Sequence, residues 1–326
     1  MSRDVPVLHA GPTHRPAPAG PRSAGILLLI AAGVLWSLAG LAVKWARTDP
    51  ICFAAVRSFG AALVMLPLLG VGARLTGRGM PGPKVMLGAA LAHTVMVAAF
   101  ISAMTFATAA EGILLQHAAP AYVAAFAWLF LGRPVNRATA VALVVALLGV
   151  AAMLAGADHS GGWLGRVLGV VAGFGFAAVI LSLDAVESDS IRRTGLPPNV
   201  FAVVCVNNLV AAAALGIWAV PRGLFSMPPD LVLKLIALGM VQMAAPYVLF
   251  QLGLRRVGPV VASLLALLEP VLNPIWTWLG AGEIPPGSVY VGGSLILFAV
   301  AITALFGRRR DADPLPEAPG STTPPR

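Results

Sequence analysis

Charged side chains are scarce in this sequence. Asp, Glu, Lys and Arg together make up 11% of the 326 residues, whereas a soluble domain has about 25%. Apolar residues make up 58% of the chain, and its mean hydropathy is +0.87. A soluble protein of this size could not cover its surface with so few polar groups. The composition therefore excludes a soluble globular protein and indicates an integral membrane protein, with the lipid bilayer as its surroundings.

Cysteine is also rare, and several functional motifs are missing. The two cysteines, Cys52 and Cys205, both lie in apolar stretches. They provide neither a disulfide framework nor a Cys-rich metal site, and no metal or other cofactor is predicted. The sequence also lacks the Gly-x-x-x-x-Gly-Lys-[Ser/Thr] motif of a nucleotide-binding loop and the His-Glu-x-x-His motif of a zinc protease.

Ten apolar runs are long enough to cross a bilayer, which takes about 20 helical residues. The predicted spans are residues 24–46, 51–72, 84–105, 109–131, 138–156, 163–185, 199–220, 231–253, 258–280 and 287–307. Pro-rich segments precede and follow them, and residues 1–22 and 308–326 are predicted to be disordered cytoplasmic tails. The sequence thus predicts an all-α integral membrane protein with ten transmembrane helices.

The basic residues are unevenly distributed between the loops and account for the net charge of +9. With the N-terminus inside, 16 of the 22 Lys and Arg residues fall in cytoplasmic segments and five on the opposite side. The positive-inside rule then places both termini in the cytoplasm. The charge follows from this topology, so no nucleic-acid partner is predicted. Frequent Ala, Gly and Arg are typical of a high-GC bacterium, which suggests the inner (plasma) membrane.

The chain repeats itself at an offset of 150 residues. Matching pairs in this register include Pro120 with Pro270, Trp128 with Trp278 and Gly132 with Gly282. Residues 23–156 and 157–307 are therefore predicted to be two repeats of five spans each. Because five is odd, the second repeat must have the opposite orientation in the membrane. Such an inverted repeat is typical of secondary transporters, whose substrate site lies between the halves near the midplane.

A family pattern recurs at equivalent places in the two repeats. In the second repeat it runs from Gly258-Pro259 through Leu268-Glu269-Pro270 to Gly282-Glu283; in the first it runs from Leu114-Leu115 through Pro120 and Trp128 to Gly132-Arg133. This pattern resembles that of the EamA family of the drug/metabolite transporter superfamily, over residues 24–307. The family commonly has Glu where Arg133 stands. The resemblance implies a ten-helix carrier, usually an exporter of amino acids, other metabolites or drugs, with a cavity lined by spans 1, 3, 4, 6, 8 and 9.

Polar residues within apolar spans are costly and usually face a cavity. Glu269, Asn273 and Trp276 share one stripe of the ninth span, and Pro270 and Pro274 interrupt the helix beside them. A carboxylate at a broken helix suits a substrate ammonium group or a proton. We therefore predict that this stripe binds substrate and that Glu269 also couples protons. The alternative is a neutral Glu269 that is bonded to a neighbouring helix.

Other spans supply further candidates. Gln116 and His117 lie deep in the fourth span, and His117 can relay a proton near neutral pH. Glu111, nearer the outer end, is a third proton-coupling candidate, although a carboxylate there can simply reach headgroups or water. Arg57, inside the second span, could pair with Glu111 or a substrate carboxylate, or extend to the surface. The remaining substrate-binding candidates, each with helix packing as the alternative, are His93, Trp36, Gln242 and Tyr247.

These features favour a secondary-active transporter that exports a small amino acid-like or drug-like metabolite by alternating access. Its predicted partners are the small-molecule substrate and the bilayer. Proton coupling, exchange and facilitated movement all fit the sequence, and no oligomeric state is predicted. A non-transporting membrane sensor or partner protein is one alternative, but the tails contain no recognisable binding domain. An intramembrane enzyme is another, but His93 and His117 lie on different spans without an obvious third metal ligand. The chain is therefore predicted not to be an enzyme.

Overall fold

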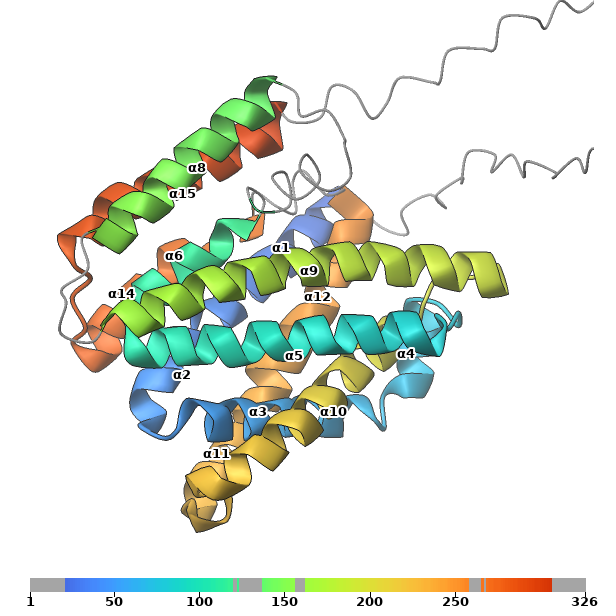
Figure 1. The fold of residues 1–326 in the computed structure, drawn as a ribbon. Coiled ribbons are helices and arrows are strands. Elements are labelled where there is room, and N and C mark those ends of the chain that lie inside the picture. Colours follow the sequence, from blue (N-terminus) through green and yellow to red (C-terminus); the bar gives the residue numbers. More distant parts are fainter. Residues whose placement is uncertain are drawn as a thin grey trace, which may run out of the picture.

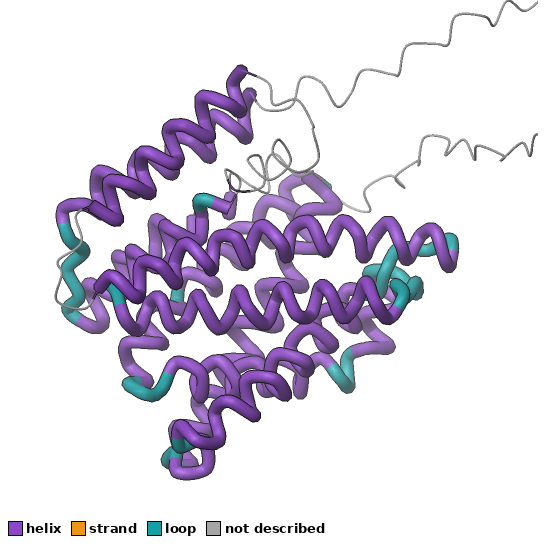
Figure 2. Tube along the Cα trace, viewed as in Figure 1, coloured by secondary structure: helices purple, strands orange, loops and turns teal. Residues whose placement is uncertain are grey.

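The computed structural model describes residues 21–119, 122, 137–155, 162–257, 265–266 and 268–306. These residues form helices joined by short loops, and no extended strand occurs among them (Figures 1 and 2). The predicted all-α fold is thereby confirmed for the described part of the chain. Nearly all of the two predicted tails lies outside it, as do several positions of the family pattern. These are Pro120, Trp128, Gly132, Arg133, Gly258 and Pro259.

The helices follow the order of the predicted spans. In the first half they are α1 (Arg22–Ser37), α2 (Ala39–Ala46), α3 (Pro50–Met65), α4 (Leu69–Leu75), α5 (Pro83–Phe106), α6 (Ala109–His117) and α8 (Arg137–Ala155). In the second half they are α9 (Gly162–Thr194), α10 (Val200–Ala219), α11 (Pro229–Leu238), α12 (Ala245–Val257), α14 (Leu268–Ala281) and α15 (Gly287–Phe306). Two short 3-10 helices, Val220–Arg222 and Leu224–Ser226, precede α11, and a π-helix, η3 (Gly239–Ala244), joins α11 to α12.

Side-chain caps define where several helices begin. The Asp49 carboxylate accepts hydrogen bonds from the backbone N–H groups of Ile51 and Cys52, directly before α3. Thr108 and Glu111 form a reciprocal capping box at the start of α6. Such caps satisfy N–H groups that have no partner within the helix. They explain why the chain turns at these residues although the surrounding sequence is almost uniformly apolar.

Several of the described helices are long and apolar enough to cross a membrane. Five stretches meet both conditions: Ser23–Ala46, Pro83–Phe106, Gly162–Thr194, Val200–Arg222 and Pro229–Gly253. The pair α3 and α4, bent by 69°, makes a sixth if it is one span. Large apolar side chains such as Phe225, which is 85% exposed, cover the outside of the bundle. An outer surface of this kind suits contact with lipid. A multi-pass membrane protein follows, while the number of ten spans stays a prediction.

The main helix pairs join one half of the chain to the other. Helix α1 packs on α12, α5 packs on α9, α3 packs on α10, α6 packs on α14, and α8 packs on α15 at one edge of the bundle (Figure 1). The 150-residue offset makes α5 equivalent to α11–α12 and α8 equivalent to α15, while the match of Gly33 with Gly173, at an offset of 140 residues, makes α1 equivalent to α9. The match of Phe53-Ala54 with Phe201-Ala202 makes α3 equivalent to α10. Exchanging the two repeats therefore turns the α1–α12 pair into the α5–α9 pair and leaves the α3–α10 and α8–α15 pairs unchanged. This pattern is the one that a two-fold relation between the repeats produces.

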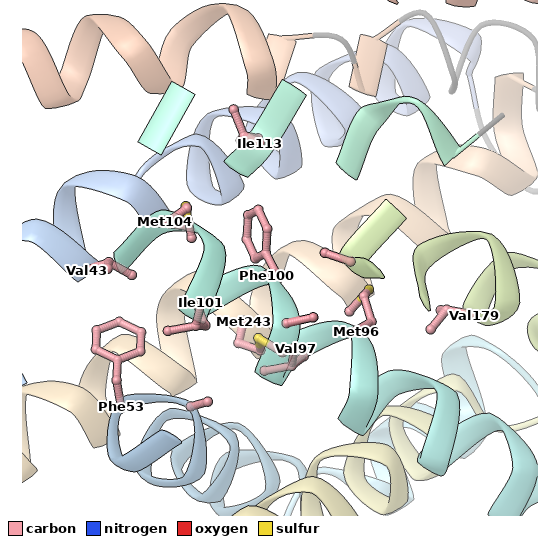
Figure 3. Close-up of a cluster of buried hydrophobic side chains, with 14 of the residues drawn as sticks. Val43, Phe53, Met96, Val97, Phe100, Ile101, Met104, Ile113, Val179 and Met243 are labelled. Carbon is pink, nitrogen blue, oxygen red and sulfur yellow. The ribbon is translucent and has the colours of Figure 1, made fainter. Parts of the chain in front are cut away.

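A continuous apolar core lies between these pairs. Phe53 of α3, Ile101 of α5 and Met243 of η3 are among the buried side chains at its centre, where helices of both repeats meet (Figure 3). Two glycines let the backbones approach closely there. A Cβ atom on Gly239 would lie 2.0 Å from the carbonyl oxygen of Arg57, and one on Gly60 would lie 2.2 Å from that of Ile236. The contact between α3 and the α11–η3 segment thus depends on the absence of side chains.

Replacing Gly239 with Ala should destabilise the protein, because its methyl group would overlap a backbone carbonyl that cannot move aside easily. We expect a loss of about 1–3 kcal/mol, as for other overpacked interiors. Gly216→Ala is the matched control, because a Cβ on Gly216 meets open space. Thermal unfolding of the two purified variants in detergent, followed by tryptophan fluorescence, should show a lower melting temperature for Gly239→Ala only. Equal melting temperatures would contradict the close approach.

Candidate functional site

Two helix interruptions lie at the centre of the bundle, and the first separates α1 from α2. Helix α1 ends at Ser37 and α2 begins at Ala39, with Leu38 between them. Side chains of the second repeat bond to the backbone at this point. The Gln242 side-chain amide donates to the carbonyl oxygen of Trp36 at 3.1 Å, and that of Asn273 donates to the carbonyl oxygen of Ser37 at 3.0 Å. Carbonyl groups exposed by a broken membrane helix need such partners.

The second interruption is the π-helix η3, which contains Gln242. Single π-helical turns within longer helices are frequent at functional sites. While its amide nitrogen bonds to Trp36, the Gln242 Oε1 atom accepts a hydrogen bond from Arg57 Nη1 at 2.9 Å. Gln242 therefore connects the α1 break with α3. Trp36, Arg57 and Gln242 all line one cavity.

That cavity is the candidate site; its volume is about 50 Å³, and the space within its outline is about 470 Å³ when the open solvent at its mouth is included. It lies between the two repeats, because α1, α3, α5 and α6 form its wall together with α9, η3, α12 and α14. Six of the predicted site residues line it: Trp36, Gln116, His117, Gln242, Tyr247 and Glu269. The other lining residues are Arg57, Met96, Val97, Phe100, Phe176 and Met243. A mostly apolar wall with a few converging polar groups is typical of small-molecule sites.

Glu269 and His117 face each other across this cavity. Glu269 Oε2 lies 3.6 Å from His117 Nε2, and the other ring nitrogen, Nδ1, lies 2.9 Å from the carbonyl oxygen of Ile113. A carbonyl oxygen only accepts, so Nδ1 must carry a proton. Attraction between Nε2 and the carboxyl group then requires one more proton, on either partner. The pair can therefore hold a proton that is shared between helices of the two repeats.

Arg57 is almost completely enclosed, with 2% of the residue exposed. Its guanidinium lies 5.6 Å from the centre of the Phe53 ring and donates to Gln242. The predicted pairing with Glu111 is wrong, because Glu111 bonds to Arg166 instead. Extension of Arg57 to the surface is excluded by the same burial. The guanidinium is therefore a positive charge on the wall of the cavity.

Three predicted site residues lie behind the cavity wall. The Asn273 side chain and the Trp276 indole both bond to Ser37, the latter through Nε1 to Ser37 Oγ at 2.9 Å. The ring of His93 stacks edge-on against Tyr247 with their centres 5.9 Å apart. None of the three is among the lining residues. In this structure they position the broken helix and Tyr247, and their role in substrate binding stays a prediction.

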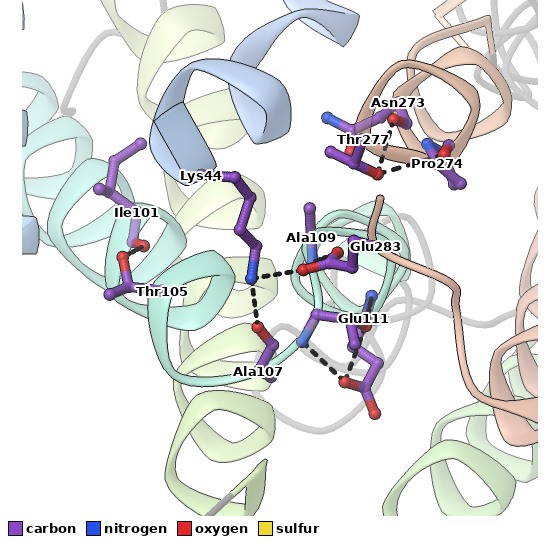
Figure 4. Close-up of polar contacts among 11 residues, drawn as sticks. Lys44, Ile101, Thr105, Ala107, Ala109, Glu111, Asn273, Pro274, Thr277 and Glu283 are labelled. Atoms are coloured by element: carbon purple, nitrogen blue, oxygen red, sulfur yellow. Dashed lines mark hydrogen bonds and ion pairs between the residues drawn. The ribbon is translucent and has the colours of Figure 1, made fainter. Parts of the chain in front are cut away.

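A polar cluster joins the repeats at one end of the bundle (Figure 4). Lys44 Nζ lies 2.6 Å from Glu283 Oε2 and donates to the carbonyl oxygen of Ala107 at 3.0 Å. The second carboxylate oxygen of Glu283 accepts from the backbone N–H of Ala109 at 2.7 Å. Lys44 thus forms a partly buried ion pair between the two repeats. The cluster ties α2 and the α5–α6 turn to the segment that follows α14.

Glu111 lies close to this cluster, but in a different environment from the predicted one. Only 2% of it is exposed, so the expected contact with headgroups or water is wrong. Its carboxylate lies 2.5 Å from Arg166 Nε and also accepts from the backbone N–H and hydroxyl of Thr108. Burial of α6 against α9 explains the difference, because it encloses the whole capping box. Glu111 does not line the cavity, and its part in proton coupling stays a prediction.

Met96, Phe176 and Met243 are among the lining residues that the sequence reasoning missed. Apolar side chains on an apolar helix give no composition signal. The repeat relation does contain one for Phe176, because the Gly33/Gly173 match places it opposite Trp36 in the other half. The 150-residue offset likewise places Val97 opposite Tyr247, and both line the cavity. Equivalent positions of the two repeats therefore line the same site.

Comparison with known proteins decides the family. A sequence model of the EamA-like transporter family matches residues 23–155 and again residues 163–305. The chain belongs to the EamA-like transporter family. This membership agrees with the resemblance seen in the sequence, and it makes the protein a membrane transporter built from two EamA repeats.

The relatives of this EamA chain are similar along most of their length. An uncharacterized transporter of Archaeoglobus fulgidus is 29% identical over 279 residues, which are 85% of this chain and 95% of the relative. The pseudopaline exporter CntI of Pseudomonas aeruginosa is 24% identical over 281 residues, 84% of this chain and 94% of that protein. A solved crystal structure with 21% identity covers 88% of this chain and 99% of its own, with a TM-score of 0.55. That last similarity concerns the fold alone.

Loss of the buried ion pair between Glu111 and Arg166 should lower the stability of the protein. Glu111→Gln removes the carboxylate that faces Arg166 and leaves a buried guanidinium against a neutral amide. Breaking a buried ion pair in this way costs about 3 kcal/mol or more, so the melting temperature in detergent should fall clearly. Asp230→Asn is the control, because it breaks the exposed ion pair with Lys234 and should hardly change the melting temperature. If both variants behave alike, the Glu111 pair contributes nothing to stability.

Proposed function

We propose that this EamA chain is a secondary-active exporter of a small, amino acid-like or drug-like metabolite. The observation that carries this proposal is the cavity between the repeats, with ionisable Glu269, His117 and Arg57 in its wall. Ionisable groups are costly inside a membrane and usually mark a substrate or ion pathway. A central site formed by both halves, beside interrupted helices, is what a secondary transporter needs.

Alternating access explains why the two helix interruptions lie at this cavity. The groups that bond to the α1 break, Gln242 and Asn273, come from the opposite repeat. A rocking movement of one repeat against the other would change these contacts together and open the cavity to one side at a time. At one end of the bundle, the Lys44–Glu283 pair would separate when that side opens.

Export and topology complete the proposal. The direction rests on the similarity to the pseudopaline exporter of Pseudomonas aeruginosa, and that protein's substrate is not transferred to this chain. We propose ten spans in two inverted repeats, 23–156 and 157–307, between cytoplasmic tails 1–22 and 308–326. Both termini are proposed to lie in the cytoplasm. The proposed location is the inner membrane.

The proton shared by Glu269 and His117 supplies a coupling mechanism. In the inner membrane, protons enter the cell down their gradient while substrate leaves. A substrate whose ammonium or other N–H group binds Glu269 would displace the shared proton, and a proton that binds would release that group. Competition of this kind couples the two movements without any further cofactor.

Metabolite profiling of the culture medium tests the export function. Cells that produce the wild type should enrich one compound outside, and cells that produce Glu269→Gln at the same membrane level should enrich it at least about tenfold less, the effect of losing about 1.4 kcal/mol of interaction. Glu187→Gln is the charge-matched control, since Glu187 is exposed near the end of α9. Equal export by wild type and Glu269→Gln would leave Glu269 a structural role. An unchanged medium in every strain would favour import or a sensor role.

Proton coupling makes a separate prediction for purified protein in liposomes. With the exported compound as substrate, an imposed pH gradient should drive wild-type accumulation above equilibrium. Glu269→Gln should only equilibrate the compound, because its amide cannot take part in proton exchange. The measurement is radiolabelled uptake with and without a proton ionophore. Gradient-driven accumulation by the variant would refute the coupling role of Glu269 and leave transport itself intact.

A further inference from the structure

We propose that Arg57 binds the carboxylate of the transported molecule, and that the substrate is a small carboxylic acid with a flat apolar body. This inference rests on the proposed function insofar as it concerns transport. The binding part can be tested on the purified protein alone. Sequence reasoning left Arg57 with three alternatives, and the structure removes two of them.

The position of Arg57 makes its charge costly. It lies in the middle of α3 with 2% of its surface exposed, between Phe53 and the cavity. A buried charge loses its hydration and is tolerated only when other groups compensate for that loss. Sequence position alone also permitted its long side chain to reach the membrane surface, but the enclosure leaves the cavity as the place that its guanidinium faces.

The protein itself compensates this charge only in part. Nη1 donates to the neutral Gln242 amide, while Nε is buried without a hydrogen-bond partner among the described residues. Within the same part of the chain, no carboxylate of the protein forms an ion pair with Arg57. The acidic residue that shares its cavity, Glu269, lies 3.6 Å from His117. A guanidinium with free donors on a cavity wall is suited to bind a carboxylate through two parallel hydrogen bonds.

The number of charges favours a single carboxylate over a phosphate. Arg57 is the one Lys or Arg residue among those that line the described cavity, and Glu269 contributes a carboxyl group to the same wall. A doubly charged phosphate would need more than one cation. One negative charge is what one guanidinium can neutralise.

The remaining wall indicates the body of the ligand. The rings of Trp36 and Tyr247 meet edge to face with their centres 5.1 Å apart, and Trp36 also lies 5.3 Å from Phe250. Phe100 and Phe176 add two more rings to the lining. Flat apolar groups pack well against such faces and edges. Gln116 Oε1, which is buried without a partner among the described residues, can accept a hydrogen bond from an N–H or O–H group of the ligand.

Binding of three related probes tests the carboxylate preference. The probes are 3-phenylpropionate, 3-phenylpropanol and phenethylamine, which combine the same ring with an acid, a neutral alcohol or an ammonium group. We expect the wild type to bind the acid at least about tenfold more tightly than either other probe, a difference of about 1.4 kcal/mol. Quenching of tryptophan fluorescence and the shift of the melting temperature measure binding independently. Equal affinity for acid and alcohol, tighter binding of the amine, or no binding of the acid would overturn the proposal.

Two variants assign the preference to Arg57. Arg57→Gln should lose at least the same tenfold factor for the acid and retain its affinity for the alcohol. Gln242→Glu keeps Arg57 but gives it an internal carboxylate 2.9 Å away, and it should lose affinity for the acid in the same way. This second variant keeps the test valid if Arg57→Gln does not fold. Arg74→Gln, which removes an exposed Arg, is the control and should bind like the wild type.

The outcomes separate this inference from the proposed function. Arg57-dependent binding of the acid, together with an unchanged culture medium, would support the anchor and contradict export. If the Arg57→Gln variant exports a compound to the same extent as the wild type, export is supported and the anchor role of Arg57 is contradicted. Unchanged affinity for the acid in both Arg57→Gln and Gln242→Glu would remove Arg57 from the binding site.

Discussion

Backbone groups inside a bilayer find no water, so every interruption of a membrane helix must be satisfied by the protein itself. In this EamA chain the interruption after Ser37 is satisfied from the other repeat, by Gln242 and Asn273. The site and the joint between the repeats are therefore the same place. A side chain that holds the repeats together also forms or supports the cavity wall. A change at such a side chain therefore affects the fold and the site together.

The same constraint applies to charge. Arg57 and Glu269 face one cavity, yet Arg57 donates to Gln242 while Glu269 lies 3.6 Å from His117. A direct ion pair between them would satisfy both charges and leave nothing for a ligand. Neutral or titratable partners stabilise each charge only in part. The part of each charge that the protein does not compensate can then interact with a substrate that carries the complementary group.

Much of this architecture was predictable from the sequence, because long apolar runs and polar residues within them are strong signals. The helices over residues 84–105 and 199–220 and the six lining residues around Glu269 are examples. What failed was the direction in which a side chain points. Glu111 was expected to reach headgroups or water, but it lies against Arg166. Asn273 bonds to Ser37, and its role in substrate binding stays a prediction. Helical spacing fixes the stripe on which a residue lies, whereas the neighbouring helix decides what that stripe contacts.

The repeat relation also shows why the site is asymmetric. The 150-residue offset that makes Val97 equivalent to Tyr247 pairs Glu269 with Ala119 and His117 with Leu267. The Gly33/Gly173 match, at an offset of 140 residues, makes Trp36 equivalent to Phe176. The match of Phe53-Ala54 with Phe201-Ala202 places Arg57 opposite Cys205. A fully symmetric cavity would contain each charge twice, and two buried carboxylates or guanidiniums near one axis would repel each other strongly in a low-dielectric site. Apolar lining residues can be duplicated without such repulsion. The aromatic walls therefore follow the repeat, and each charged group occurs in only one half.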